Sequence, residues 1–99
     1  MNVRVLDLRE ITTFADYFVI CSGANQRQIQ AVSDAVGEEM KKHGETPVSW
    51  EGYNNAEWIL MDYGDLIVHI FSEKARTYYD LERLWRHAKE VPVPDQSES

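Results

Sequence analysis

The stretch EWILMDYGDLIVHIF, residues 57–71, decides the fold, because Gly64 and Asp65 separate two apolar runs within it. A Gly-Asp pair between hydrophobic runs predicts a β-hairpin, since glycine accepts the positive φ angle that a tight turn requires. Taking these two residues as the loop fixes the register of both strands. The cross-strand pairs are then Tyr63–Leu66, Asp62–Ile67, Met61–Val68, Leu60–His69, Ile59–Ile70 and Trp58–Phe71.

The two faces of this hairpin differ in character, because side chains alternate along a strand and cross-strand partners share a face. The first face is a plain core face made of Ile59, Met61, Tyr63, Leu66, Val68 and Ile70. The second face mixes aromatic, acidic and imidazole groups and consists of Trp58, Leu60, Asp62, Ile67, His69 and Phe71. What covers this second face is therefore the functional question for the chain.

Length and composition indicate one domain with a core. The chain has 99 residues, and we expect a domain over residues 1–91 and a polar, disordered tail over residues 92–99. A hydrophobic fraction of 43% is sufficient for a core. The single cysteine, Cys21, excludes an internal disulfide and a cysteine-based zinc cluster. No segment has the ~18 apolar residues of a membrane span and no signal peptide is visible, so we expect a cytosolic protein or one inside an organelle.

The charge balance bears on the partner. The chain has 17 acidic and 10 basic residues and a net charge of −7. This argues against nucleic-acid binding that is dominated by phosphate contacts, because such binding needs clustered Lys and Arg. We expect no sequence-specific nucleic-acid binding. The negative charge favours a soluble protein whose partner is basic.

Local patterns predict the remaining elements. A β-branched run indicates a first strand over residues 3–8, and the nearly continuous apolar run 16–21 indicates a central strand buried on both faces. A helix is expected over residues 26–43, capped by Asn25 or Ser22, and a short edge strand over residues 47–50. The apolar stripe of this first helix is Ile29, Val32, Val36 and Met40. A second helix is expected from Ser72 to the prolines Pro92 and Pro94, with the inner stripe Tyr78, Leu81, Trp85 and Ala88.

This order predicts an α/β (α+β) fold with a mixed sheet of about five strands and both helices on one face. Little remains to cover the other face, so the second face of the hairpin is expected to be open or covered by another molecule. Five large side chains there would form a larger exposed patch than monomers usually tolerate. The patch is therefore predicted to bind a partner.

Three blocks of the sequence carry a family resemblance. They are DYFVICSGANQRQ (residues 16–28), EGYNNAEWILMDYGDLIVHIF (residues 51–71) and the spacing R-x-x-Y-x-L-E-x-L-W from Arg76 to Trp85. Together they closely resemble the Iojap-like ribosome silencing factors over nearly the whole chain, from Val5 to Trp85. Family members usually carry a helix ahead of the first strand, whereas Val3 here stands two residues after Met1. Dimer contacts made by such a helix are therefore left open for this chain.

The resemblance implies a fold and a function. The fold would be nucleotidyltransferase-like without transferase activity. The protein would bind the large ribosomal subunit through the ribosomal protein numbered fourteen, block joining of the small subunit, and reduce translation when nutrients are limiting. It would thus act as a cytoplasmic translational repressor and a negative regulator of ribosome biogenesis, with a homodimer as a further expectation. No catalytic residue, metal or cofactor is expected.

Chemical alternatives remain for several residues. Asp62 and Asp65 could form a metal-binding pair of a nucleotidyl- or phosphoryl-transferring enzyme, although turn chemistry explains an aspartate there better. His69 lacks an obvious nucleophile and is interpreted as a structural or interface histidine, and Cys21 as an inert buried thiol. A third class is a self-associating structural protein that uses the open face for its own dimer. The predicted partner-binding residues are Trp58, Leu60, Asp62, Asp65, Ile67, His69, Phe71, Arg76, Tyr79 and Glu82.

Overall fold

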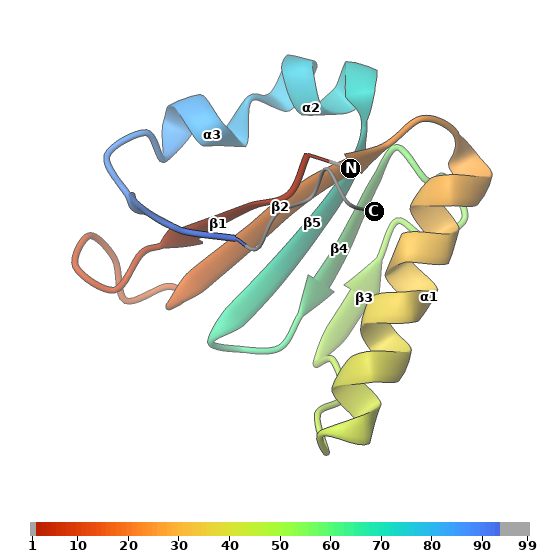
Figure 1. Ribbon diagram of the computed structural model, residues 1–99, viewed down its shortest axis with the longest axis horizontal. Coiled ribbons are helices and arrows are strands. Elements are labelled where there is room, and N and C mark those ends of the chain that lie inside the picture. Colours follow the sequence, from red (N-terminus) through yellow and green to blue (C-terminus); the bar gives the residue numbers. More distant parts are fainter. Residues whose placement is uncertain (1, 94–99) are drawn as a thin grey trace.

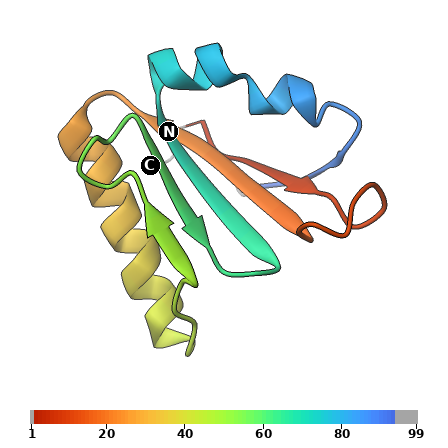
Figure 2. The same cartoon turned by 180° about the vertical axis from the view of Figure 1, so that it is seen from behind.

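A mixed sheet of six strands carries helices on both of its faces (Figures 1 and 2). The computed structural model describes residues 2–93. The elements are β1 Arg4–Asp7, β2 Tyr17–Gly23, α1 Gln26–Lys42, β3 Ser49–Glu51, β4 Trp58–Asp62, β5 Leu66–Ser72, α2 Glu73–Tyr79, α3 Leu81–Leu84 and β6 Lys89–Val91. The strand order is β3-β4-β5-β2-β1-β6, with β2 and β5 parallel and all other neighbours antiparallel. The predicted α/β (α+β) class with a mixed sheet is confirmed, with one strand more than expected.

The hairpin of β4 and β5 has the predicted register at every position from Trp58–Phe71 to Asp62–Ile67. Gly64 takes the left-handed conformation that the turn requires, with φ at 92°. The turn is fastened on one side by the carboxylate of Asp62, which accepts the Gly64 N–H at 2.8 Å. The backbone N–H of Tyr63 donates to the Leu66 carbonyl at 2.8 Å. The two-residue loop therefore follows directly from the Gly-Asp pair.

Helix α1 covers the plain core face, as its apolar stripe predicts. The Asn25 side chain caps it by accepting the Gln28 N–H at 2.8 Å, and Gly44 ends it with φ at 78°. Ile29 is buried against a cluster of β2, β4 and β5 residues: Cys21, Ile59, Met61, Tyr63, Val68 and Ile70. The first helix and the first face of the hairpin are thus confirmed as one core.

The edge strand β3 packs beneath the middle of α1. A Cβ atom built at Gly37 would lie 2.9 Å from the Trp50 ring, so a larger residue there would displace this ring or the helix. The Trp50 indole N–H donates to the Ser33 hydroxyl at 2.8 Å. The short edge strand is confirmed, displaced by one to two residues from the predicted range.

The expectation that both helices cover one face is wrong. In Figures 1 and 2, α2 and α3 lie across the face opposite α1. They bury Ile67 and Phe71 of β5 together with Phe18 and Ile20 of β2. The physical reason was present in the sequence: a strand such as β2 that is apolar at successive positions needs cover on both faces.

The expected second helix is also wrong in its length. It breaks at Asp80, whose φ of 52° is left-handed, and the chain then forms α3 and the strand β6 on β1. The break brings Glu82 to Arg76, whose Nε and Nη2 donate to its carboxylate at 2.9 and 3.1 Å. Residues six apart would not face each other on an uninterrupted helix. Tyr78, expected on the inner stripe, is 79% exposed, because the short α2 presents it to solvent.

Other parts of the second-helix prediction hold. Leu81, Trp85 and Ala88 pack on the core, as expected. Residues 94–99 of the predicted tail lie outside the described residues. Within residues 2–93, no helix is long and apolar enough to cross a membrane.

Candidate docking surface

The face beneath α2 and α3 is covered only in part. Helix α2 packs on β5 and β2, whereas the β4 side chains Trp58, Leu60 and Asp62 remain half-buried. Glu51 pairs with Leu60 across β3 and β4, and Ser49 pairs with Asp62, so these side chains share the same face. We call these five residues, Ser49, Glu51, Trp58, Leu60 and Asp62, the open row. A hollow of about 320 Å³ is lined by Glu51, Gly52, Trp58 and Leu60.

Trp58 is held in place from three directions. Its ring centroid lies 4.6 Å from that of Tyr79 on α2 and 5.0 Å from that of Phe71 on β5. Its indole N–H donates to Nδ1 of His69 at 3.0 Å. A rigid aromatic side chain with one exposed edge is typical of an interface anchor, because little conformational entropy remains to be lost on binding.

His69 is a structural histidine in this arrangement. An indole N–H can only donate, so Nδ1 must accept and the neutral ring carries its proton on Nε2. Among residues 2–93, that Nε2 atom is buried without a hydrogen-bond partner. Burial lowers the pKa of His69 from 6.5 to about 4, because desolvation disfavours the charged ring. The ring packs edge-on to Phe18 at 4.6 Å and acts as a fixed support for Trp58.

Four carboxylates lie on or next to β3 and β4: Glu51 and Asp62 belong to the open row, Glu57 directly precedes β4, and Asp65 lies in the turn that follows it. None of them forms an ion pair with a basic side chain of residues 2–93. The hydrogen bonds of Glu57 to Ser72 and of Asp62 to Gly64 leave their charge in place. The surface beside Trp58 and Leu60 is therefore negative and complementary to Lys and Arg of a partner.

Arg76 and Glu82, two predicted partner-binding residues, are engaged inside the protein. Arg76 is buried and also donates through Nη1 to the Asn2 carbonyl at 2.7 Å and to the Ser22 hydroxyl at 3.1 Å. Glu82 additionally accepts from Arg4 at 2.8 Å. Arg76 and Arg4 hold the pKa of Glu82 below its usual value. This ion pair fastens α2 and α3 to each other and to β1.

The other predicted site residues divide into two groups. Ile67, His69 and Phe71 are buried beneath α2 and α3, so the expectation that they lie on an open surface is wrong. Trp58, Leu60, Asp62, Asp65 and Tyr79 do reach the surface, and Tyr79 is 49% exposed. Partner contacts by any of the ten residues remain a prediction.

The geometry of Asp62 and Asp65 fits turn chemistry. Asp62 accepts a backbone N–H of the turn, and the Asp65 carbonyl accepts the N–H groups of Asp16 and Tyr17 at 2.8 and 3.0 Å. No group of three or more His, Cys, Asp or Glu side chains within residues 2–93 is arranged to hold a metal ion. Cys21 is buried, and burial raises its pKa to about 11, so the thiol is unreactive at neutral pH.

Sequence reasoning missed three surface residues. Glu51 lies outside the strand expected over residues 47–50, and only the register of β3 on β4 places it beside Leu60. Tyr78, expected on the inner stripe of the second helix, and Leu84 are 79% and 68% exposed. Asp80 was the available signal, since aspartate tolerates the left-handed conformation better than most residues.

The fold and the surface define a class of protein: a small α/β domain with a partly open sheet face on which aromatic and aliphatic side chains lie beside carboxylates. The comparisons narrow this class. The sequence profile of the family described as "Ribosomal silencing factor during starvation" matches residues 1–99. The chain therefore belongs to the ribosomal silencing factor family, which confirms the resemblance drawn from three sequence blocks.

Individual relatives agree with this assignment. Ribosomal silencing factors of Bacillus subtilis and Halalkalibacterium halodurans are each 38% identical, over 88% and 93% of this chain and 74% and 79% of their own lengths. The chloroplastic protein Iojap of Zea mays is 30% identical over 94% of this chain and 40% of its own length. A crystal structure of a Chromobacterium violaceum protein superimposes with a TM-score of 0.83 at 30% identity, covering 95% of this chain and 78% of that one.

Proposed function

We propose that this protein docks through its open row on a basic protein of the large ribosomal subunit and represses translation by steric block. The single observation that carries the proposal is the half-buried pair Trp58 and Leu60, accompanied in the open row and at the two ends of β4 by four carboxylates that form no ion pair with a basic side chain of residues 2–93. Aromatic anchors dominate the energetics of protein interfaces, and complementary charges select the partner and speed association.

The family description supports a ribosomal target, since it names silencing of ribosomes during starvation. The proposed partner is the ribosomal protein numbered fourteen of the large subunit, the partner that the family resemblance implies. Bound there, a domain of this size would occupy a surface that the small subunit must reach. The mechanism requires binding alone and no chemical step. It would operate in the bacterial cytoplasm or, as the names of the plant relatives indicate for those proteins, in chloroplasts and mitochondria.

The test is co-sedimentation of the purified protein with isolated large subunits, followed by addition of small subunits. We expect the protein to sediment with large subunits and to lower the fraction of joined ribosomes. Replacing Leu60 by Ala should weaken both effects. Phe14→Ala is the matched control, because Phe14 is 63% exposed on the β1–β2 loop, away from the open row.

Two outcomes would contradict the proposal. Folded Leu60→Ala protein that binds and blocks like the unchanged chain would exclude the open row as the docking surface. Tight, stoichiometric binding of Mg²⁺ or Mn²⁺ that depends on Asp62 and Asp65 would favour a transfer enzyme instead. A dimer that survives addition of large subunits would favour self-association through this face.

A further inference from the structure

The ten Lys and Arg side chains fall into two groups. Five of them form ion pairs: Arg4, Arg9, Lys42, Arg76 and Lys89. The other five form no ion pair with residues 2–93, and three of these lie close together in sequence: Lys74, Arg83 and Arg86. All three are exposed, and they belong to α2, α3 and the turn that follows. Of the five basic side chains without an ion pair to residues 2–93, three thus lie on one segment and two, Arg27 and Lys41, lie on α1.

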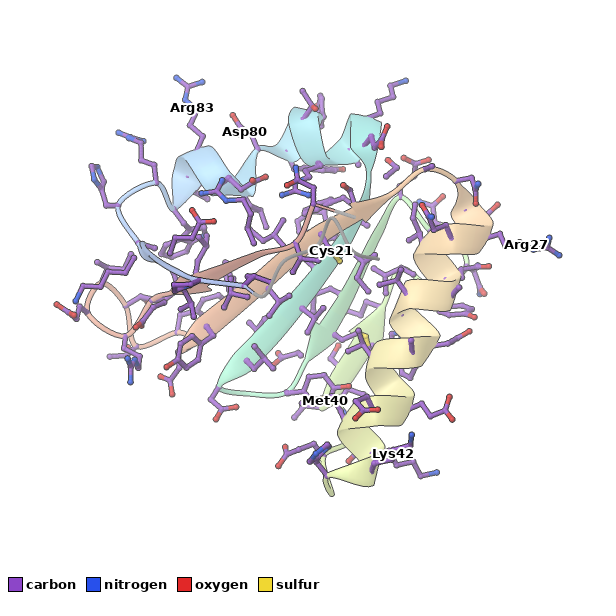
Figure 3. The ribbon with its side chains drawn as sticks, in the orientation of Figure 1. Cys21, Arg27, Met40, Lys42, Asp80 and Arg83 are labelled. Carbon is purple, nitrogen blue, oxygen red and sulfur yellow. The ribbon has the colours of Figure 1, made fainter. Side chains whose placement is uncertain are left out.

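Exposed apolar side chains accompany these cations. Tyr78 and Leu84 are 79% and 68% exposed, and the rings of Tyr78 and Tyr79 meet edge to face at 5.0 Å. A hollow of about 540 Å³ is lined by Thr77, Tyr78, Tyr79, Asp80, Arg83, Leu84 and Arg86. Figure 3 shows the Arg83 side chain extending from α3 away from the sheet. We call Lys74, Tyr78, Arg83, Leu84 and Arg86 the helical face.

The sign of the charge changes locally on this segment. Residues 73–88 contain four basic and three acidic side chains, although the whole chain carries a net charge of −7. Arg76 and Glu82 form an ion pair. The remaining charges of residues 73–88 are three positive ones, on Lys74, Arg83 and Arg86, and two negative ones, on Glu73 and Asp80. A local cationic surface on an acidic protein suits a polyanion that lies beside a basic partner.

We propose that the helical face contacts the phosphate backbone of ribosomal RNA next to the protein on which the open row docks. This inference rests on the proposed function, because it takes the large subunit as the target. Guanidinium groups bind phosphate oxygens in a bidentate manner, and exposed tyrosines offer surfaces for stacking of unpaired bases. Ribosomal RNA is the polyanion that lies beside basic proteins in the large subunit, so charge complementarity favours RNA as the occupant of the helical face.

The geometry allows both contacts at once. Tyr79 joins the two surfaces, because its ring packs on Trp58 of the open row at 4.6 Å and on Tyr78 of the helical face at 5.0 Å. The acidic part of the molecule would meet basic protein and the cationic part would meet RNA. The contact is not sequence-specific, in keeping with a binding surface made of a few phosphate contacts.

The test measures the affinity of the full chain for purified large subunits over a series of salt concentrations. The variant is Arg83→Gln with Arg86→Gln, and the control is Arg27→Gln with Lys41→Gln, an equal charge change on exposed, unpaired residues of α1. Each lost phosphate contact should lower the slope of log affinity against log salt by about 0.7–0.9. We expect the first variant to bind several-fold more weakly with a flatter slope, and the control to behave like the unchanged chain. Photo-crosslinking from position 78 should label RNA.

The outcomes separate this inference from the proposed function. Unchanged affinity and salt slope of the Arg83 and Arg86 variant, while the unchanged chain binds large subunits, would overturn the RNA contact and leave the docking proposal standing. Crosslinks from position 78 to ribosomal protein only would also overturn it and would assign an acidic protein occupant. Failure of the unchanged chain to bind large subunits would overturn both.

Discussion

The two faces of the sheet are built from the same strands but differ in how completely helices cover them. Beneath α1 the face is apolar throughout, and Ile59, Met61 and Ile70 are fully buried. Beneath α2 and α3 the cover stops at β5, which leaves Trp58 and Leu60 of β4 half-buried. Because side chains alternate, one step along β4 leads from a core residue to a surface residue. Core residues and surface residues are therefore interleaved in sequence but separate in space.

The strongest test of this comparison pairs two aromatic residues that are cross-strand neighbours. Phe71→Ala removes a side chain that is 1% exposed, and a buried aromatic costs about 3–5 kcal/mol on truncation to Ala. Trp58→Ala should lower the free energy of unfolding by clearly less, while weakening large-subunit binding by about 2 kcal/mol. Urea unfolding and subunit binding measure the two effects. If both variants fail to fold, Trp58 belongs to the core and the open row loses its anchor.

The second prediction concerns the interactions that hold α1 on one face of the sheet and α2 and α3 on the other. Helix α1 is held by its apolar stripe, whereas α2 and α3 also depend on the Arg76–Glu82 ion pair. Arg76→Met would leave Glu82 with Arg4 alone and should lower the free energy of unfolding by about 3 kcal/mol, because the charge-assisted bonds to Glu82 and the bonds to the Asn2 carbonyl and the Ser22 hydroxyl are lost together. Asn25→Ala, which removes the cap of α1, should cost about 1 kcal/mol. Equal losses for the two variants in thermal or urea unfolding would contradict this difference.

The third prediction is a pH dependence specific to the α2–α3 side. The pKa of His69 is lowered from 6.5 to about 4 in the folded protein, so folding favours the neutral ring. The stabilisation is fully present above pH 6.5 and is lost as the pH falls toward 4, because the unfolded chain then binds the proton first. At pH 5 the loss from this group should be about 2 kcal/mol. In His69→Gln the amide oxygen still accepts the Trp58 N–H. The free energy of unfolding of this variant, measured against pH, should lack the decrease that protonation of His69 causes.

A matched control is available for the histidine. His87 is exposed after α3, and His87→Gln should keep the slope of the unchanged protein between pH 7 and pH 5. A slope that persists in His69→Gln would assign the titration to another group.

The sequence predicted the α1 side well and the α2–α3 side poorly, for physical reasons. The Gly64-Asp65 loop and the stripe from Ile29 to Met40 are local signals, and each was sufficient alone. The break at Asp80 accompanies a tertiary contact, because Arg76 reaches Glu82 only when the helix is interrupted between them. The open row could be located on β4 by alternation, whereas its boundary could not, since that boundary depends on where α2 comes to rest.

The smallest expected effect concerns the charges that border the open row. The double change of Asp62→Asn and Asp65→Asn should lower the association rate with large subunits several-fold at low salt and flatten its salt dependence, because surface charges steer encounter and are screened beyond about 8 Å at physiological ionic strength. The dissociation rate, set by Trp58 and Leu60, should change less. Folding should be retained, since an asparagine at position 62 keeps the oxygen that accepts the Gly64 N–H.

The control for this prediction places the same charge change elsewhere. Glu38→Gln with Glu45→Gln neutralises two exposed carboxylates, one on α1 and one on the loop after it. The net negative charge decreases by the same amount as in the Asp62 and Asp65 variant, while the open row is unchanged. Stopped-flow association over a salt series compares the two double variants. If both slow association equally, the net charge of −7 steers binding and the position of the carboxylates beside the open row is irrelevant. If neither changes the salt dependence, the acidic border has no part in recognition, and the apolar pair Trp58 and Leu60 must select the partner by shape.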